Sequence, residues 1–525
     1  MIDRAYWHPV GGRMYFDSSK SFLFRETGQS WTTCRRERNL LGSRAAWRIL
    51  TVIIALIINP LSVRANDWSQ IYFGGGVSVD GVTRDANLIV PGSVSGFGGN
   101  LDLNFGLDGV AGGSVSGHVL AGGDYQVNNL FVIGAYSSYS WSNFNPTLSI
   151  NAGRLPFSVN LLNPENNWLV AGRVGVLVSP YTLLFGSLGY SWMEFDTVNL
   201  EAQGLGGPFS AVLDFGTFEG TTVGFGMESR VAKNVAVRAE YKHTDYGSEM
   251  TLGKNSGQVR ETVEPVLDTL SLAAVISLNG LGPANGDSND IQSFLGNPVS
   301  NKWTQFYLGG GLGADLISGD QVVSFNGPTL GTTNTIYKDD PAGGNFGGGI
   351  VAGADIQLTN RIVAGLFGSY DWAGDGVSLT AELNGFGQVL SLALPSLDNY
   401  WTVGGRVGLL AAPSVLLYGL GGYAEAEIND QSIVLDPNGI FGLGQAQGEF
   451  VLTLPSLAGY VVGGGAEVKI TDNISFRGEY RKLELGTQST RSARSTGDFI
   501  DLTVDPTIHT GRIALTFRHD FGLAQ

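Results

Sequence analysis

Cysteine, charge and long apolar runs are all scarce in this chain of 525 residues. Cys34 is the one cysteine, so neither a disulfide framework nor paired-thiol chemistry is available. Only 15% of the residues are charged, and no helix of useful length is evident. The longest apolar run, 49–58, is well short of the roughly 20 residues that a membrane-spanning helix needs. Helical bundles and helical membrane proteins are therefore disfavoured.

Basic residues are the scarcer of the two charge types. The segment 1–65 takes 10 of the 31 basic and 4 of the 47 acidic residues, which leaves a net charge of −22 on the rest. This acidic excess disfavours nucleic-acid binding. Within 1–65, arginines precede the apolar run, Pro60 breaks it, and Val63-Arg64-Ala65 offers a small-residue cleavage site. We expect an export signal that is removed before Asn66.

Glycine and aromatic residues are abundant, with 77 Gly and 10% aromatics, which favours β structure. The stretch 224–247 returns as 463–486: in both, an alternating segment, a short polar turn and a second alternating segment end at Arg-x-Glu-Tyr. This pattern predicts a tight β-hairpin. Other landmarks recur in the same order, among them Gly-Arg-Val-Gly at 172–175 and 405–408. The chain is a tandem duplication.

The duplication sets the expected domains. They are the signal segment 1–65, a first β-barrel repeat 66–281, a linker 282–301 and a second β-barrel repeat 302–525.

Each copy contains eight alternating segments whose connections alternate in length. In the first copy they lie near 71–79, 116–126, 130–142, 168–178, 182–195, 219–230, 235–244 and 268–278. The connections at 80–115, 143–167, 196–218 and 245–267 are long, and those between are two or three residues. Short turns on one side and long loops on the other are typical of outer-membrane barrels, and about ten residues suffice for a tilted bilayer crossing. A soluble sandwich has no reason to segregate its loops.

Aromatic residues mark the strand ends, as an interfacial belt predicts. They are Trp68, Tyr72, Tyr139, Trp141, Tyr181 and Tyr190 in the first copy and Trp303, Tyr307, Tyr370, Trp372, Tyr400 and Trp401 in the second.

The opening Trp-x-x-x-Tyr-x-Gly-Gly, the Gly-Arg-Val-Gly strand and the Arg-x-Glu-Tyr hairpin resemble a known family. It is the opacity-type or immunogenic outer-membrane surface proteins of alpha-proteobacteria, related to the eight-stranded domain of the outer-membrane protein A class. The resemblance covers 68–278 and 303–518 and implies an eight-stranded outer-membrane barrel in each copy. Two features depart from the family: its unit normally occurs once, and this chain runs past Phe521 to Gln525.

Charged residues fall on the strand face opposite the apolar one, which in a membrane barrel faces the lumen. They are Arg173, Glu228, Arg238 and Glu240, with Arg406, Glu467, Arg477 and Glu479 in the second copy. A charged lumen could select solutes. We favour a structural network that plugs the lumen, because eight strands leave room for little more than their own side chains and buried charges persist when paired.

Evidence for catalysis or cofactors is lacking. His118, His243, His509 and His519 are scattered, and no spacing indicates a metal site, a phosphate loop or a nucleophile with its base. We predict no enzyme and no cofactor. Asp339-Asp340 could bind a cation that bridges lipopolysaccharide phosphates, but a solvated loop tip is the plainer interpretation.

The sequence is compatible with two ways of closing the strands into barrels. Each copy can close as its own eight-stranded barrel, which we favour because each has a full set of motifs, or all strands can form one sixteen-stranded barrel with an aqueous channel.

The leading functional hypothesis is a surface protein of the bacterial outer membrane with a structural or interaction role through long extracellular loops. A passive diffusion porin is the alternative, and a lipid-modifying enzyme a distant one. Expected partners are outer-membrane lipid, lipopolysaccharide and the barrel assembly machinery; the loop ligand is left open.

Overall fold

A computed structural model covers the whole chain. It describes 23–24, 32–33, 68–278 and 302–520, apart from gaps at 92–102, 109, 142–146, 153–154, 161–163, 180, 196, 205–206, 233, 254–258, 329–330, 340–342, 373–376, 384–386, 395–396, 436–447 and 496. The expected cleavage site, the linker 282–301 and Asp340 lie outside these residues. Two short strands, β1 (Leu23–Phe24) and β2 (Thr32–Thr33), pair near the N-terminus. Within the described part, no helix is long and apolar enough to cross a membrane.

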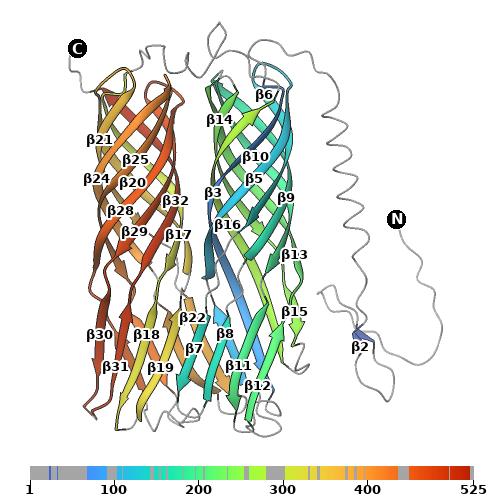
Figure 1. Cartoon of the computed structure of the whole chain (residues 1–525), viewed down its shortest axis with the longest axis vertical. Coiled ribbons are helices and arrows are strands. Elements are labelled where there is room, and N and C mark those ends of the chain that lie inside the picture. Colours follow the sequence, from blue (N-terminus) through green and yellow to red (C-terminus); the bar gives the residue numbers. More distant parts are fainter. Residues whose placement is uncertain are drawn as a thin grey trace, which may run out of the picture. The chain divides into compact units, whose positions relative to one another are not determined.

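The first repeat forms a closed antiparallel barrel of eight strands (Figure 1). It closes where β16 pairs with β3 along its whole length, from Arg260↔Ile89 to Ser277↔Tyr72. The strands are β3 (Gln70–Val90), β5 (Val110–Gln126), β6 (Phe131–Trp141), β9 (Pro164–Ser179), β10 (Thr182–Phe195), β13 (Thr217–Ala232), β14 (Val235–Asp245) and β16 (Arg260–Ser277).

The second repeat forms its own closed barrel, in which β17 pairs with β32 from Gln305↔Asp520 to Ser318↔Thr507. Its strands are β17 (Gln305–Ser318), β20 (Gly343–Gln357), β21 (Ile362–Trp372), β24 (Leu397–Ala412), β25 (Val415–Ile428), β28 (Leu457–Lys469), β29 (Ile474–Leu485) and β32 (Thr507–Asp520). The prediction of two eight-stranded barrels is confirmed. The single sixteen-stranded barrel is wrong, because each copy satisfies its edge strands internally.

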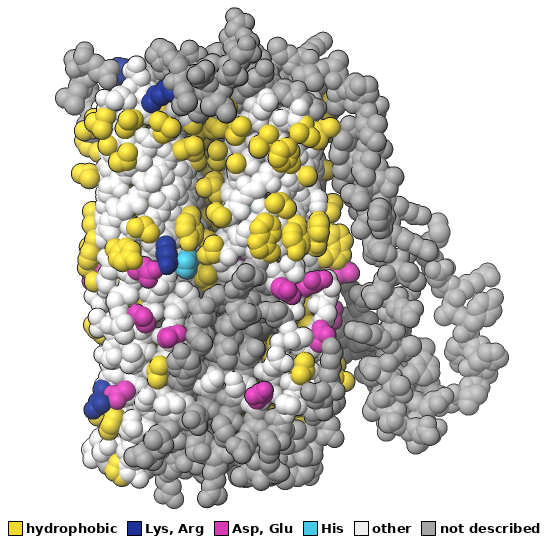
Figure 2. Space-filling view, viewed as in Figure 1, with side chains coloured by type: hydrophobic (Ala, Val, Ile, Leu, Met, Phe, Trp, Pro, Cys, Tyr) yellow, Lys and Arg dark blue, Asp and Glu magenta, His cyan; other side chains and the backbone are white. Residues whose placement is uncertain are grey.

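Strand alternation divides the walls into an apolar outer face and a polar inner face. Leu188, Val223 and Leu366 point outward, and each of these apolar side chains is more than half exposed. Figure 2 shows hydrophobic side chains gathered on the barrel walls and acidic side chains beyond them, towards the loop strands. An apolar band flanked by polar residues is what a bilayer requires of a barrel wall.

Glycine on the inner face lets the closing strands approach. A Cβ on Gly76 would lie 1.9 Å from the Leu272 carbonyl oxygen, and one on Gly311 would lie 2.0 Å from that of Ile513. Both positions are at the β3–β16 or β17–β32 closure, so any side chain there would force the barrel open.

The expected aromatic belt is only partly on the outer wall. Trp141, Tyr190, Tyr370, Trp372 and Trp401 face outward and are exposed. The belt assignment is wrong for five others, which are buried inside the barrels: Trp68, Tyr72, Trp303, Tyr307 and Tyr400. Tyr72, Tyr307 and Tyr400 lie on the inner face of their strands, and Trp68 and Trp303 lie just before β3 and β17. Cation–π and hydrogen-bond partners hold all five. Position near a strand end does not by itself choose between lipid and lumen.

The long connections are not simple loops. Within the described residues they contain fourteen further strands. From the first repeat these are β4 (Leu103–Asp108), β7 (Thr147–Ala152), β8 (Leu155–Asn160), β11 (Val198–Gly204), β12 (Gly207–Leu213) and β15 (Glu249–Leu252). From the second they are β18 (Gln321–Gly327), β19 (Gly331–Asp339), β22 (Val377–Leu383), β23 (Gly387–Leu394), β26 (Gln431–Leu435), β27 (Gly448–Leu452), β30 (Gln488–Ala493) and β31 (Phe499–Val504).

These strands pair across the two repeats in a reciprocal way. In the first connection of repeat 1, β4 pairs with β22, which belongs to the second connection of repeat 2. In the first connection of repeat 2, β19 pairs with β7, which belongs to the second connection of repeat 1. The two pairings join equivalent elements and are therefore related by an approximate twofold axis.

The reciprocal pairing builds two sheets of eight strands each from both repeats. One runs β15-β16-β3-β4-β22-β23-β26-β27, using the outer ends of β16 and β3, and the other runs β12-β11-β8-β7-β19-β18-β31-β30. Their buried faces belong to one apolar cluster that includes Leu88, Val263 and Ile433 from the first sheet and Leu200 and Phe325 from the second. We call these two sheets and their shared core the loop body.

The barrels also contact each other directly, within the single compact unit that residues from 62 onward form. The contact is an apolar cluster to which both repeats contribute. A Cβ on Gly478 would lie 3.0 Å from the Cβ of Ala239, its equivalent in repeat 1, and one on Gly511 would lie 3.3 Å from the Cβ of Leu270, again its equivalent. The seam between the barrels is thus isologous, like the interface of a twofold dimer.

Candidate functional site: the two lumen networks

Inward positions on neighbouring strands bring the charged side chains of repeat 1 together. Glu228 on β13 lies directly opposite Arg238 on β14 in the strand register. Arg173 reaches the same level from β9, and Asp124 from the end of β5. All four side chains are almost fully buried. Local alternation therefore directs each residue inward, and the barrel register sets their common height.

In barrel 1, Glu228 is the centre of the network. Its Oε2 accepts hydrogen bonds from Arg173 Nη1 at 2.9 Å and from Arg238 Nη2 at 2.6 Å. Arg173 also binds Asp124, with Nε donating to Oδ1 at 2.8 Å. The amide of Gln70 donates to both carboxylates, at 3.1 Å to Asp124 and 3.2 Å to Glu228. Two guanidinium groups and two carboxylates leave this layer neutral.

Glu240 occupies the next inward position on β14. It accepts a hydrogen bond from the Tyr136 hydroxyl at 2.5 Å and one from Ser187 Oγ at 3.0 Å. The Arg238 guanidinium lies 4.8 Å from the centre of the Tyr72 ring. Aromatic rings and hydroxyl groups thereby contact these charged side chains on the sides where no ion pair forms.

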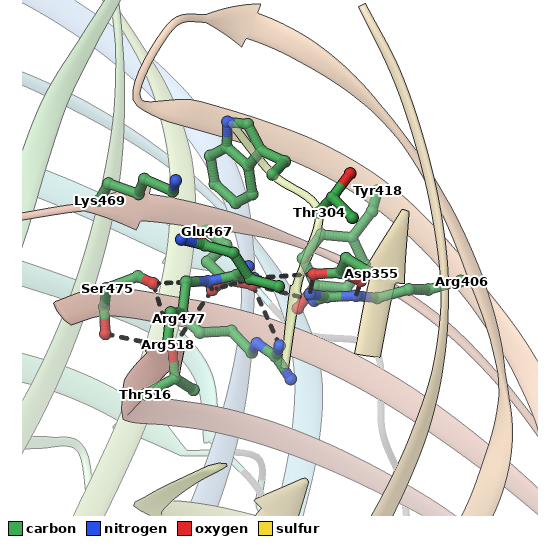
Figure 3. A network of polar contacts seen from close by, with 12 residues as sticks. Thr304, Asp355, Arg406, Tyr418, Glu467, Lys469, Ser475, Arg477, Thr516 and Arg518 are labelled. Carbon is green, nitrogen blue, oxygen red and sulfur yellow. Dashed lines mark hydrogen bonds and ion pairs between the residues drawn. The ribbon is translucent and has the colours of Figure 1, made fainter. Parts of the chain in front are cut away.

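Barrel 2 repeats this centre with an additional cation (Figure 3). Glu467 Oε2 accepts from Arg406 Nη1 at 2.9 Å and from Arg477 Nη2 at 3.0 Å. Arg406 Nε donates to Asp355 at 2.9 Å. Arg518, from the closing strand β32, donates to Glu467 at 2.8 Å and to Asp355 at 2.9 Å. The layer holds three guanidinium groups for two carboxylates.

Arg518 has no charged counterpart in barrel 1. Its register partner is Tyr307, and the equivalent Tyr72 pairs with Ser277. The carboxylates that Arg518 joins in barrel 2 are joined in barrel 1 by the Gln70 amide. The equivalent Gln305 instead donates to Asp520 at 2.8 Å. The two lumens reach the same packing through different residues.

A second charged layer lies towards the loop body in barrel 2. Arg512 forms an ion pair with Asp371, placed over Gly349. Arg481 forms an ion pair with Glu479 and donates to Ser369 Oγ at 2.7 Å. In barrel 1 the position of Gly349 is taken by His118, as both pair with the matching glycines Gly76 and Gly311. Different side chains fill this level too.

All eight charged residues predicted from the sequence lie inside the two lumens, four in each. Arg173, Glu228 and Arg238 contact one another, as do Arg406, Glu467 and Arg477. Glu240 and Glu479 accept hydrogen bonds from the hydroxyl groups of Tyr136 and Tyr418, each at 2.5 Å.

Sequence reasoning did not include Asp124, Asp355, Gln70, Arg481 and Arg518. The recurring Asp-x-Gln at 124–126 and 355–357 was available as a signal for the two aspartates. Arg518 gave none, because the first copy has serine in its place.

The charged groups of these networks are paired with one another inside the lumens. Every carboxylate at their centres is held by a buried guanidinium, and none faces an open cleft with a nucleophile beside it. Among the described residues no group of histidine, aspartate and glutamate could hold a metal ion. His243 and His509 lie on the outer wall, away from both networks. Asp339 ends β19 beside Thr147 of β7.

The family model described as outer membrane protein beta-barrel domain matches residues 49–263 and again 273–510. The chain belongs to this family. Its two matches correspond to the two barrels, and they place the protein in the bacterial outer membrane.

Relatives of the family show how far the likeness extends. The 31 kDa outer-membrane immunogenic protein of Brucella melitensis is 28% identical over 182 residues, which are 34% of this chain and 68% of that protein. Among solved structures, Ail of Yersinia pestis is 13% identical with a TM-score of 0.23, covering 42% of this chain and all of Ail. OprG of Pseudomonas aeruginosa is 11% identical with a TM-score of 0.26, covering 43% and 100%. At such TM-scores the two structures carry no conclusion about this chain.

Proposed function

We propose that this outer-membrane protein is a non-conducting, non-enzymatic surface protein whose two barrels anchor the loop body outside the cell for interaction with a partner. The observation that carries the proposal is the buried ion-pair layer in each lumen. The side chains of Arg173, Glu228 and Arg238, and of Arg406 and Glu467, are at most 2% exposed. A pathway for solutes would leave such groups in contact with water.

The loop body supports the surface role. Long connections of outer-membrane barrels face the outside, and here they contain most of the β structure beyond the wall. The apolar cluster shared by both sheets gives this part a core of its own. A rigid, extended surface is better suited to binding a partner than mobile loops are, because less conformational entropy is lost.

Planar-bilayer recording of the purified, refolded protein tests the proposal against a diffusion porin. We expect no steady large conductance. The matched variant is Arg173→Ala/Glu228→Ala/Arg238→Ala, which removes the barrel 1 layer and should raise the frequency of channel openings. Steady large channels in the unaltered protein that do not change in the variant would establish a porin. They would contradict the interpretation of the ion-pair layer as a plug.

Exposure of the loop body is tested by labelling intact cells. Ser489→Cys on β30 should react with a membrane-impermeant maleimide, whereas Asn128→Cys in a short turn should react only after the cells are opened. Labelling of Asn128→Cys in intact cells would reverse the orientation.

A further inference from the structure

Equivalent polar side chains face outward on the last two strands of each barrel. In repeat 1, His243 of β14 and Asp268 of β16 lie directly opposite each other. His243 Nδ1 is 2.8 Å from Asp268 Oδ1, and the Tyr241 hydroxyl donates to the same oxygen at 2.7 Å. A single internal carboxylate therefore satisfies both the ring nitrogen and the hydroxyl.

Repeat 2 has the same arrangement with a histidine in place of the Asp268 carboxylate. Lys482 of β29 lies opposite His509 of β32, so His509 takes the place of Asp268. Tyr480, the equivalent of Tyr241, is hydrogen-bonded to His509 Nδ1 at 2.7 Å. Lys482 pairs with Glu484, two residues along the same strand. An ammonium and an imidazole thus adjoin each other where repeat 1 has an imidazole and a carboxylate.

The position of Lys482 and His509 on the outer wall of barrel 2 indicates what kind of hydrogen-bond acceptor can reach them. Lys482 lies beside Val462, and Glu484 beside Tyr460, two side chains that are about half exposed on the outer face. This is the border between the apolar wall and the loop body, where the headgroups of the outer leaflet lie. Glu194, Glu219, Glu425 and Glu427 also point outward near this border in the described wall, and their carboxylates would repel an anion.

We propose that Lys482 and His509, with the His509 ring held by Tyr480, bind the phosphate group of an outer-leaflet lipid, which supplies the acceptor that the Asp268 carboxylate provides in repeat 1. When the Tyr480 hydroxyl donates to Nδ1, the ring proton is on Nε2, and this N–H and the Lys482 ammonium are both donors for phosphate oxygens. Tyr480 is held in place by Val79 of repeat 1 and Leu316. The site is independent of any partner of the loop body.

The chain offers its own matched variants. His509→Asp copies repeat 1 and supplies an internal carboxylate to Lys482 and Tyr480, so it should fold normally and lose the site. The double variant His243→Lys/Asp268→His copies repeat 2 into repeat 1 and should create a second site. Lys482→Met removes the cation alone. Heat-modifiable migration on gels checks that each full-length variant has folded.

Native mass spectrometry after reconstitution with lipid A provides the measurement. We expect one firmly retained lipid A more in the unaltered protein than in His509→Asp, retention about tenfold weaker in Lys482→Met, and one more lipid in His243→Lys/Asp268→His. Lipid A without its phosphates should not be retained at the site. Equal retention by the unaltered protein and His509→Asp overturns the proposal.

A second arm separates a lipid from free phosphate. Inorganic phosphate is titrated against the lipid A complex in detergent, and millimolar phosphate should leave the additional lipid bound. Full displacement at that concentration, with phosphate alone bound equally well by the unaltered protein, would mark a free-anion site and overturn the lipid assignment.

Discussion

Glu228 and Glu467 occupy matching places in the two lumens, yet different donors neutralise them. Arg173, Arg238 and the Gln70 amide surround Glu228, whereas three guanidinium groups surround Glu467. A buried carboxylate needs compensation on every side, but the compensation does not have to come from the same strand. The duplicated chain therefore contains two independent solutions to one packing problem.

Removal of Glu228 should be costly. Glu228→Ala leaves Arg173 and Arg238 without their shared partner inside the lumen, which we expect to lower the free energy of unfolding by about 3–5 kcal/mol. Asp501→Ala, which breaks the exposed Arg491–Asp501 pair of the loop body, should lower the free energy of unfolding much less, because solvent screens an exposed pair. Guanidinium unfolding of the two variants in lipid vesicles measures the difference. Equal midpoints would mean that Glu228 is hydrated.

The sequence predicts which face a charged residue takes but not its contacts. Alternation alone directed Arg173 and Arg406 towards the lumen. It could not pair Glu240 with Tyr136 rather than with an arginine, since that contact depends on rotamers across the barrel. Arg518 was not identified either, because one unrepeated arginine in an alternating strand has the same pattern whether it pairs or not.

At the level of strands, the inner-face glycines are as restrictive as the charges. A methyl group on Gly311 would lie 2.0 Å from a carbonyl oxygen of the neighbouring β32, whereas one on Gly310 would meet no atom closer than 3.7 Å. Adjacent glycines of the same strand thus differ entirely in what they tolerate.

Substitution of these two glycines tests the closure of barrel 2. Gly311→Ala should prevent or slow closure, because β17 cannot approach β32, and Gly310→Ala should stay within about 0.5 kcal/mol of the parent. The fraction of protein that becomes heat-modifiable during refolding measures closure. A Gly311→Ala variant that refolds as completely as Gly310→Ala would show that the strands can separate at no cost.

The strand count of each wall could be predicted from the sequence, and the strands of the connections could not. Walls such as β10 and β13 have an apolar face set by lipid, which gives a clear period of two. Strands such as β7 and β22 are short, and each pairs with a strand of the other repeat. Their stability comes from partners remote in sequence, which single-sequence patterns do not record.

The unit formed by the residues from 62 onward resembles a twofold dimer joined into one chain. Equivalent residues meet at the seam, as Ala239 and Gly478 do, and equivalent connections exchange strands in the loop body. Two barrels closed separately would otherwise be free to part in the membrane.

Cysteine pairs test this arrangement, in a chain whose Cys34 is first replaced by serine. Ala239→Cys/Gly478→Cys should form an intramolecular disulfide, because the two Cβ positions are 3.0 Å apart and small shifts bring them to disulfide geometry. Val223→Cys/Val462→Cys joins residues that are likewise equivalent but face lipid, and should stay reduced. Gel mobility before and after reduction reports whether each cysteine pair has formed its disulfide. Cross-linking of the second pair instead would place the barrels back to back.

The exchange between β4 and β22, and between β19 and β7, has a consequence for how the loop body can vary. On an isolated barrel, a surface loop can change its length or sequence while its neighbours stay as they are. Here an insertion in β7 shifts its register against β19, which is encoded in the other half of the gene. Changes of length in these strands of the loop body are therefore expected to be tolerated best when both repeats change together.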